Sequence, residues 1–451
     1  MEYRYGESFR PKKSAACSKQ SFLKKNVVNA VAVWKNPYHC AILSREVLRM
    51  FFARYFMANE RLRRLYVVDY LVTPDERIEN AAVLCENEKI IAVGGLSGFS
   101  LETQLEVLRF ENAYMTPGFI DTHIHGAGGC DCSALESSPR TLEDMCLTLC
   151  RCGVTGFLPT VVSNTPDAMI SNLGNLVSEM SRVTDGAEPL GVHVEGPFLN
   201  PCKSGSQPAE LLSEIDLKFA EDIFKTGNGK IKTMTFAPEL ANSDKLIELM
   251  LQYNVIPSMG HSIADADETL RAIDAGAVRC THLFNGMQPL HQRDLGLASI
   301  VLTDNRVTAE LIIDGRHVHP RMVDLACRCK RADRIVGISD GTMAAMMPDG
   351  EYHIGKTAIK VINGFSQTAS GALAGTTTML NSGWHSLMSS GHLAETRAAR
   401  AVTANPASEL KLEDRGLLRP GLRADLAVFE RGTNRLLMTV VRGKIVYRNE
   451  E

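Results

Sequence analysis

The chain has 451 residues, enough to bury a large core and to hold more than one domain. Its formal net charge of -3 at pH 7 argues against nucleic-acid binding, for which a basic excess is expected. Its apolar runs stay below the ~18 residues of a membrane span, and its 12 cysteines lack the paired spacing of a zinc site. We therefore expect a cytoplasmic protein with reduced, mostly buried thiols, whose partners include neither nucleic acid nor membrane.

Residues 1–57 differ in composition from the rest, because lysine and arginine far outnumber acidic residues there. We expect a basic N-terminal extension with little fixed structure. A basic amphipathic helix over 45–55 that contacts a membrane surface or nucleic acid is the alternative. Met57 could also be the true start, since a recognisable domain begins directly after it.

Short β-strands are predicted near both ends of the chain. Runs of β-branched and aromatic residues fall at 65–72, 81–85, 89–94, 425–429, 438–442 and 445–447. Polar or glycine-containing turns separate neighbouring runs, as at 86–88 and 443–444. We predict that 58–117 and 403–451 together form one small β-sandwich domain, and that a larger domain, 118–402, is inserted between them.

The central region alternates apolar strand-like runs with amphipathic segments. Strands are predicted at 118–125, 156–162, 190–195, 232–237, 255–260, 279–283, 308–313 and 334–339. Helices are predicted at 137–152, 165–183, 214–225, 243–253, 263–275 and 320–330. This order predicts an α/β fold with a (β/α)8 TIM barrel. A doubly wound sheet is the alternative, but it would not bring all eight strand ends together.

The stretch 117–129, PGFIDTHIHGAGG, places two histidines at the end of the first barrel strand. His123 and His125 are two residues apart, so their side chains point to the same face of a strand. Two imidazoles on one face suit a shared divalent metal ion, although such pairs also occur on strand surfaces without a metal.

Four other predicted strands end in a metal-binding or acidic side chain, namely Glu195, His261, His282 and Asp340. The C-terminal ends of barrel strands form one rim, where active sites lie. Imidazole and carboxylate suit Zn²⁺ or Fe²⁺, and such an ion lowers the pKa of a bound water. We predict a metal site with Asp340 as general base and acid. The alternative for Asp340 is capping of a helix that begins after it.

These residues resemble the amidohydrolase superfamily, with its His-x-His after strand 1, histidines after strands 5 and 6, and aspartate after strand 8. Strand 4 offers no lysine of the kind that bridges two metals in dihydroorotase-like and urease-like members, and Glu195 supplies a carboxylate instead. The motifs HVEGPFL, GHS, THLFNGM, DGRHVH and SDGTM follow in this order. Within the superfamily, residues 62–448 are similar to the N-acetylglucosamine-6-phosphate deacetylase family.

The resemblance implies metal-binding and catalytic roles. The principal metal ligands would be Glu195, His261 and His282, and a second metal position would be formed by His123 and His125. One or two divalent ions, Zn²⁺ or Fe²⁺, would therefore bind per subunit. Asp340 would be the catalytic acid and base, and His317 would contact the substrate and polarise its acetyl carbonyl.

The resemblance also implies a binding site for an amino-sugar phosphate. Asn285 and the Gly286 backbone would hold the substrate, and Arg293 would reach the phosphate from the neighbouring subunit, which implies a homodimer. Gln207 stands where related sequences often have a histidine in a segment that closes over the sugar. Glutamine can still hydrogen-bond a hydroxyl but cannot carry charge, so Gln207 bears on which sugar fits.

The expected function is metal-dependent deacetylation of N-acetylglucosamine 6-phosphate to glucosamine 6-phosphate and acetate, in amino-sugar catabolism. One alternative is the same chemistry on N-acetylgalactosamine 6-phosphate or another N-acyl substrate. A second is a cyclic-amide hydrolase on the same barrel, which would not need Arg293 or Asn285. A third is a non-catalytic scaffold, although such proteins usually lose ligands and all six positions are filled here.

Overall fold

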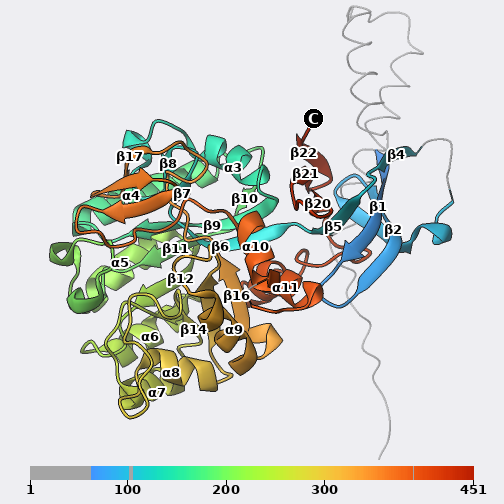
Figure 1. Cartoon of the computed structure of the whole chain (residues 1–451). Helices are drawn as coiled ribbons and strands as arrows, with labels where there is room; N and C mark the ends of the chain where they lie inside the picture. Colours follow the sequence, from blue (N-terminus) through green and yellow to red (C-terminus); the bar gives the residue numbers. More distant parts are fainter. Residues whose placement is uncertain (1–61, 101–104, 390, 451) are drawn as a thin grey trace, which may run out of the picture. The chain divides into compact units, whose positions relative to one another are not determined.

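The computed structural model describes residues 62–100, 105–389 and 391–450 (Figure 1). The expected basic extension, 1–57, lies outside these residues. Among the helices described, none combines the length and apolarity that crossing a membrane requires.

Eight parallel strands form the barrel, as predicted. They are β6 (Phe119–Ile124), β9 (Val154–Val162), β11 (Val192–Glu195), β12 (Ile231–Phe236), β13 (Ile256–Met259), β14 (Arg279–Cys280), β15 (Thr308–Ile312) and β16 (Ile335–Ile338). Neighbours pair in the order β6, β9, β11 to β16, with the short β10 (Glu188–Pro189) beside β9. A parallel bridge between Ile124, at the end of β6, and Gly341, in the segment just after β16, closes the barrel.

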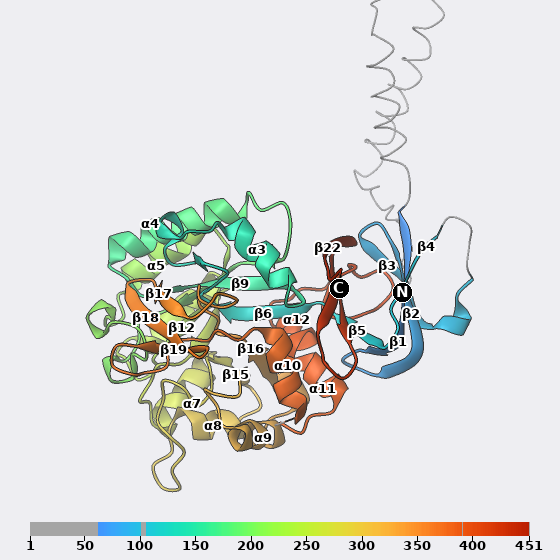
Figure 2. The ribbon, with the colours of Figure 1, turned by 45° about the horizontal axis from the view of Figure 1, so that its top comes forward.

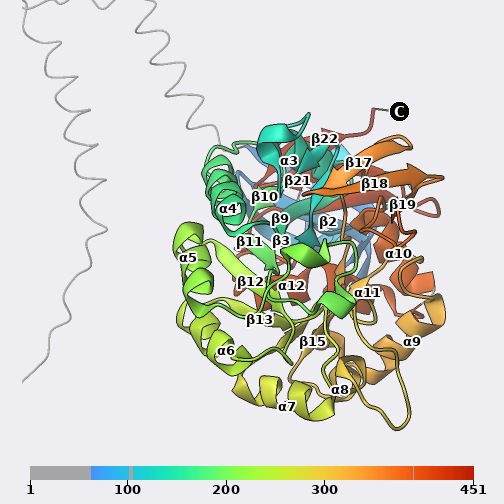
Figure 3. The same ribbon diagram turned by 90° about the vertical axis from the view of Figure 1, so that its left-hand side faces the viewer.

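Helices surround the strands when the barrel is viewed end-on (Figure 3). They are α3 (Leu142–Cys150), α4 (Pro166–Met180), α5 (Leu217–Gly227), α6 (Ser243–Gln252), α7 (Ala266–Ala275), α8 (Leu297–Thr303), α9 (Pro320–Cys329), α10 (Leu380–Ser389), α11 (Glu395–Val402) and α12 (Ala404–Glu409). Local signals set their ends. For example, α7 begins with a capping box between Asp265 and Glu268 and ends at Gly276, whose φ is 119°.

A second sheet is built from both ends of the described chain. Its strands are β1 (Arg63–Val72), β2 (Arg77–Glu86), β3 (Lys89–Gly95), β4 (Glu106–Arg109), β5 (Ala113–Pro117), β20 (Leu426–Glu430), β21 (Leu436–Val441) and β22 (Lys444–Arg448). The order is β22-β21-β20-β5-β1-β2-β3, with β4 beside β1. One face has its own apolar core, and the other packs against the barrel through Phe429, whose ring stacks 5.5 Å from that of Phe119 on β6.

The first barrel strand is a direct continuation of this terminal sheet. Only Gly118 separates β5 from β6, and Figure 2 shows β6 running from the sheet into the barrel. The Gly118 N–H donates to the carbonyl of Asp425 at 2.9 Å, and a Cβ here would lie 2.3 Å from the Thr155 side chain. A glycine is therefore needed where the chain enters the barrel.

A small antiparallel sheet follows the last barrel strand and was not among the predicted elements. It consists of β17 (Gly350–Ile354), β18 (Thr357–Ile362) and β19 (Phe365–Thr368). The hydroxyl of Thr357 donates to the carbonyl of Ser206 at 2.9 Å. This contact ties the small sheet to the loop after β11, which carries Gln207.

Candidate functional site

The strand ends bring the predicted metal-binding side chains into two overlapping clusters. In the first, Glu195 Oε1 lies 3.2 Å from His261 Nε2 and 3.1 Å from His282 Nε2, and the two imidazole nitrogens are 3.0 Å apart. Glu195 is 3% exposed, so the cluster is closed off from bulk solvent. All three side chains come from different strands, so only the closed barrel brings them together.

The second cluster contains both histidines of the His-x-His stretch. His123 Nε2 and His125 Nε2 lie 3.3 Å apart, and Asp340 Oδ1 lies 3.1 Å from His125 Nε2 and 3.4 Å from His123 Nε2. Glu195 joins the clusters, since Oε1 is 3.5 Å from His123 and Oε2 is 3.5 Å from His125. The structure thus brings together all six residues predicted at strand ends.

The arrangement of these donors fits a divalent metal ion. The outer ring nitrogens of three histidines face oxygen acceptors: His123 Nδ1 faces Glu310 Oε2 at 3.1 Å, His261 Nδ1 faces the Lys203 carbonyl at 2.6 Å, and His282 Nδ1 faces the Asn285 carbonyl at 3.2 Å. The Nδ1 of His125 is buried without a partner among the described residues. In the other three rings Nδ1 therefore carries the proton, and in the neutral ring each Nε2 turns a lone pair toward the cluster. Lone pairs and carboxylate oxygens this close repel one another unless positive charge lies among them.

The electrostatics of the clusters also favour added positive charge. Burial opposes ionisation of Glu195, but the charge of His123 and then that of His261 hold its pKa well below the ordinary value. Burial likewise opposes protonation of His261, but Glu195 raises its pKa. Burial raises the pKa of Asp340, but a hydrogen bond from His125 and the charge of His123 lower it overall. Both carboxylates are therefore ionised at neutral pH, which is the form in which a carboxylate binds a metal ion.

The backbone is strained where it presents these residues. His261, His282 and Asp340 have φ angles of 48°, 30° and 51°, in the left-handed region that residues other than glycine seldom adopt. Such conformations cluster at functional sites. The next element after Asp340 is the strand β17 and not a helix, so the capping alternative for Asp340 is wrong. A Cβ at Gly286, whose φ is 58°, would lie 3.0 Å from His261 Nδ1, so only glycine fits against this ring.

Two buried residues that the sequence reasoning missed support the second cluster. Glu310 on β15 accepts from His123 Nδ1 through Oε2, and its Oε1 binds the guanidinium of Arg279 on β14. Both side chains are fully buried, and Arg279 also pairs with Glu409. A signal for Glu310 was present in the sequence, because it is a single charge inside the predicted strand 308–313, whereas Arg279 is the first residue of its strand.

Another buried histidine, His193 on β11, is held by threonines instead of joining the clusters. Its Nδ1 lies 3.2 Å from Thr160 Oγ1 and its Nε2 2.7 Å from Thr235 Oγ1. Its ring lies edge-on to His123, with centroids 4.5 Å apart. Burial holds the pKa of His193 well below the ordinary value, so this ring is neutral and supports His123 by packing.

Gln207 lies against the carboxylate of Glu195, a predicted metal ligand, and this contact was not indicated by its sequence position. Its Nε2 donates to Glu195 Oε2 at 2.9 Å, and its Oε1 accepts from the Ser163 N–H at 3.0 Å. The residue is 5% exposed. Both ends of the amide are therefore used within the protein.

The remaining predicted residues lie around the same strand ends. His317 Nδ1 lies 2.8 Å from Asp314 Oδ2; burial lowers the pKa of His317, but this hydrogen bond raises it overall. Asn285 is half-buried, and its Nδ2 donates to the carbonyl of His282 at 3.4 Å. Arg293 is exposed in the loop between β14 and α8 and makes no hydrogen bond or ion pair to the residues that the structure describes.

Comparison with known proteins shows which family carries this site. The model of the amidohydrolase family matches residues 114–446. The chain is 32% identical over 390 residues to N-acetylglucosamine-6-phosphate deacetylase of Bacillus subtilis, covering 83% of this chain and 98% of that protein. It is 33% identical over 319 residues to N-acetylgalactosamine-6-phosphate deacetylase of Escherichia coli O157:H7, covering 70% of this chain and 84% of that protein.

Solved structures agree with the sequence comparison. A variant of N-acetyl-D-glucosamine-6-phosphate deacetylase from Mycobacterium smegmatis, in complex with N-acetyl-D-glucosamine-6-phosphate, is 28% identical and covers 85% of this chain and 99% of its own, with a TM-score of 0.79. N-acetylglucosamine-6-phosphate deacetylase from Thermotoga maritima is 30% identical, covers 84% of this chain and 98% of its own, and has a TM-score of 0.73. These similarities confirm the resemblance found in the motifs, and the chain belongs to the amidohydrolase family.

Proposed function

We propose that this chain deacetylates N-acetylglucosamine 6-phosphate, giving glucosamine 6-phosphate and acetate, in amino-sugar catabolism. The observation that carries the proposal is the pair of overlapping clusters, one of which includes Asp340, joined by Glu195 at the C-terminal end of the barrel. The Bacillus subtilis relative, which the chain matches over nearly its whole length, carries the name of this activity.

Glu195, His261 and His282 would hold the principal metal ion, and His123 and His125 would hold a second. Imidazole with carboxylate suits Zn²⁺ or Fe²⁺. When bound, such an ion supplies Lewis acidity, which activates water for attack on an amide carbonyl. Glu310 fixes the orientation of His123, and the Lys203 carbonyl does the same for His261.

Asp340 would move the proton. Its carboxylate is ionised because of the neighbouring histidines, so it can accept a proton from the attacking water. As the carbon–nitrogen bond breaks, the same proton passes to the departing amine, and acetate leaves as the carboxylate. Burial lowers the pKa of His317, but its hydrogen bond to Asp314 raises it overall, and the protonated ring would donate a hydrogen bond to the acetyl oxygen as negative charge develops on it.

The sugar phosphate would be held by Asn285, the Gly286 backbone and Arg293. The guanidinium of Arg293 is free among the described residues, and its fork suits phosphate oxygens. We propose that Arg293 acts on the active site of a second subunit in a homodimer. The buried amide of Gln207 would affect substrate binding mainly through its contact with Glu195.

Ten cysteines lie in the described part of the chain and all are free thiols, which supports a cytoplasmic location.

N-acetylgalactosamine 6-phosphate is the second candidate substrate. It is favoured by the relative from Escherichia coli O157:H7, which is named for that activity and has a similar identity to this chain. The two sugars differ in the orientation of one hydroxyl. The ratio of kcat/KM for the two epimers, measured on the same preparation, decides between them.

The proposal is tested by acetate release from N-acetylglucosamine 6-phosphate, with metal content measured on the same samples. We expect turnover by the wild type and a fall of about 10²–10⁴-fold in Asp340→Asn with metal retained. Asp167→Asn, an exposed aspartate on α4, is the control and should match the wild type. Absence of acetate release from a metal-loaded wild type, with either epimer, would overturn the proposal.

A further inference from the structure

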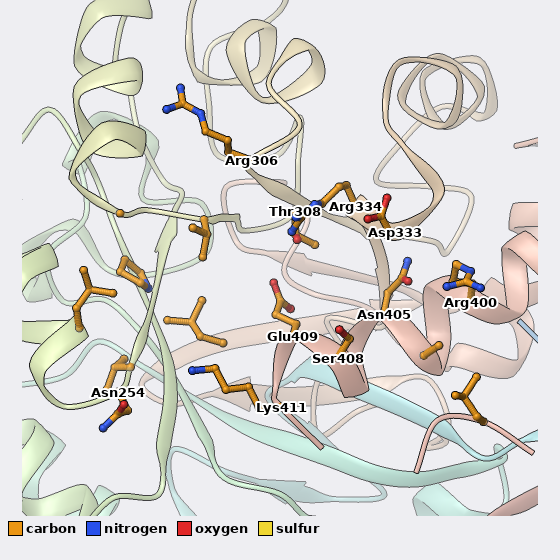
Figure 4. A pocket seen from close by; sticks show the side chains of 18 of the residues that line it. Asn254, Arg306, Thr308, Asp333, Arg334, Arg400, Asn405, Ser408, Glu409 and Lys411 are labelled. Carbon is orange, nitrogen blue, oxygen red and sulfur yellow. The ribbon is translucent and has the colours of Figure 1, made fainter. Parts of the chain in front are cut away.

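A cavity of about 800 Å³ lies at the opposite end of the barrel from the two clusters of predicted metal-binding side chains. Its walls come from the starts of β13, β15 and β16, from α12, and from the segment after α12 (Figure 4). The volume falls within the range of small-molecule binding sites. The candidate catalytic and metal-binding residues lie at the C-terminal ends of the barrel strands, so this cavity is a separate site.

Basic side chains outnumber acidic ones around this cavity. The basic residues are Arg306, Arg334, Arg400, Lys411 and Arg419, and the acidic residues are Asp75, Asp333 and Glu409. Each acidic residue already has a basic partner: Asp75 pairs with Arg400 and Arg419, Asp333 with Arg331, and Glu409 with Arg279. The acidic side chains are thus neutralised within the protein.

Two of the basic side chains have no such partner. Arg334 makes no side-chain hydrogen bond or ion pair to the described residues, and its Nε is buried without an acceptor. Lys411, on the opposite wall in Figure 4, is exposed and likewise has no carboxylate partner there. A buried guanidinium donor without an acceptor costs free energy, which a bound anion would recover.

The cavity also offers an unused acceptor. Glu409 Oε2 binds Arg279, but its Oε1 is buried without a hydrogen-bond donor. Figure 4 shows the Glu409 carboxylate directed into the space between the walls that carry Arg334 and Lys411, with Ser408 beside it. A ligand that satisfies this site needs an anionic group for the two cations and a hydroxyl or amine donor for Glu409.

We propose that this cavity is a second binding site, for a phosphorylated sugar. The phosphate would lie between Arg334 and Lys411, because a guanidinium and an ammonium together suit phosphate oxygens. A sugar hydroxyl would donate to Glu409 Oε1. This proposal does not depend on the reaction at the other end of the barrel, since it rests on the cavity's own side chains.

The cavity is connected to the metal clusters by a buried chain of charged side chains. Glu409 binds Arg279, Arg279 binds Glu310, and Glu310 accepts from His123. Substituting Glu409 would therefore disturb the support of His123 as well as the cavity. For that reason the test uses Arg334 and Lys411, whose removal breaks no ion pair of the described chain.

The experiment is calorimetric titration of the metal-loaded protein with glucose 6-phosphate, which has no acetamide. We expect Lys411→Ala and Arg334→Met each to weaken binding about tenfold or more, and Lys218→Ala, an exposed lysine on α5, to leave it unchanged. Far-ultraviolet circular dichroism and thermal unfolding confirm that each variant is folded. Arg293→Ala is titrated in parallel, because loss of binding in this variant would show that glucose 6-phosphate binds at the catalytic end of the barrel.

Two results would overturn the proposal. One is an isotherm that Lys411→Ala and Arg334→Met leave unchanged while Arg293→Ala abolishes it, because binding would then belong to the catalytic end. The other is equal affinity for inorganic phosphate and glucose 6-phosphate, because the sugar would then make no contact with Glu409. Tighter binding of glucose 6-phosphate, lost in both cavity variants, supports it.

Discussion

The side-chain amide of Gln207 donates a hydrogen bond to Glu195 Oε2 at 2.9 Å, while the other carboxylate oxygen, Oε1, faces His261 and His282. The amide is itself held by the Ser163 N–H at 3.0 Å. Gln207 thereby fixes the plane of the carboxylate that joins both clusters. A neutral side chain suits this position, since a positive one would compete with a metal ion for Glu195.

Removal of the Gln207 amide should weaken metal binding. In Gln207→Ala the carboxylate of Glu195 can rotate, and we expect metal affinity to fall about 10- to 100-fold. The measurement is competition with a chromogenic chelator. Gln252→Ala, in which the lost side chain contacts only Glu248 on the surface of α6, is the control. Unchanged metal affinity in Gln207→Ala would show that Gln207 does not position Glu195.

Asp314 should set the alkaline limit of activity. Its hydrogen bond raises the pKa of His317, so the protonated imidazole persists to higher pH than it would alone. In Asp314→Asn that pKa falls, and the alkaline limb of the kcat/KM profile should move to lower pH. Asp222→Asn, exposed on α5, should leave the profile unchanged. A limb that stays in place would mean that protonated His317 is not required.

Glu188 should stabilise the fold above mildly acidic pH. Burial raises its pKa, but hydrogen bonds from Arg423 and Arg415 lower it overall from 4.5 to about 2. Because the folded state favours the ionised form, this stabilisation is present above pH 4.5 and is lost as the pH falls from 4.5 toward 2. We expect Glu188→Gln to lower the unfolding free energy at pH 7 by on the order of 1–3 kcal/mol.

Denaturant unfolding of the wild type and Glu188→Gln at several pH values measures this difference. The difference should shrink steadily below the ordinary pKa of the carboxyl. Glu143→Gln serves as a control, because this exposed residue accepts only from Thr184. A difference that is the same at pH 3 and pH 7 would contradict the assignment to charge.

Mixed dimers should show whether Arg293 serves the neighbouring active site. Arg293→Ala should raise KM by about 10- to 100-fold, because a charged contact to phosphate is lost. If Arg293 acts across the interface, mixing it with Asp340→Asn creates dimers with one complete site, and activity returns. If each subunit uses its own Arg293, no site is complete and the mixture stays as inactive as its components.

The barrel and the two clusters of candidate metal ligands were predictable, because the sequence signal for each strand and each ligand is local. Apolar runs mark the strands, and a single donor such as His261 or Asp340 at the end of a run marks the rim. The roles of Glu310 and Gln207 depend instead on distant partners. Glu310 meets His123 across the barrel, and Gln207 meets Glu195 through a loop, so neither contact has a spacing that a sequence pattern records.

Other features depend entirely on assembly. In β18 buried residues alternate with exposed ones over a short stretch, a pattern that surface loops share, so the small sheet β17–β19 was not predicted. The cavity beneath the barrel draws its walls from segments as far apart in sequence as Asp75 and Arg419. Arg334 and Lys411 look like ordinary surface charges in the sequence, and only the fold shows that they face one space.

The direct passage from β5 to β6 has a consequence for the order of biosynthesis. β5 carries the first metal-binding strand, but its partner β20 follows every barrel strand in the chain. During translation, His123 and His125 emerge early, while the strand that anchors their support emerges near the end. We therefore expect the pairing that anchors β5, and through it His123 and His125, to form only after every barrel strand has been made.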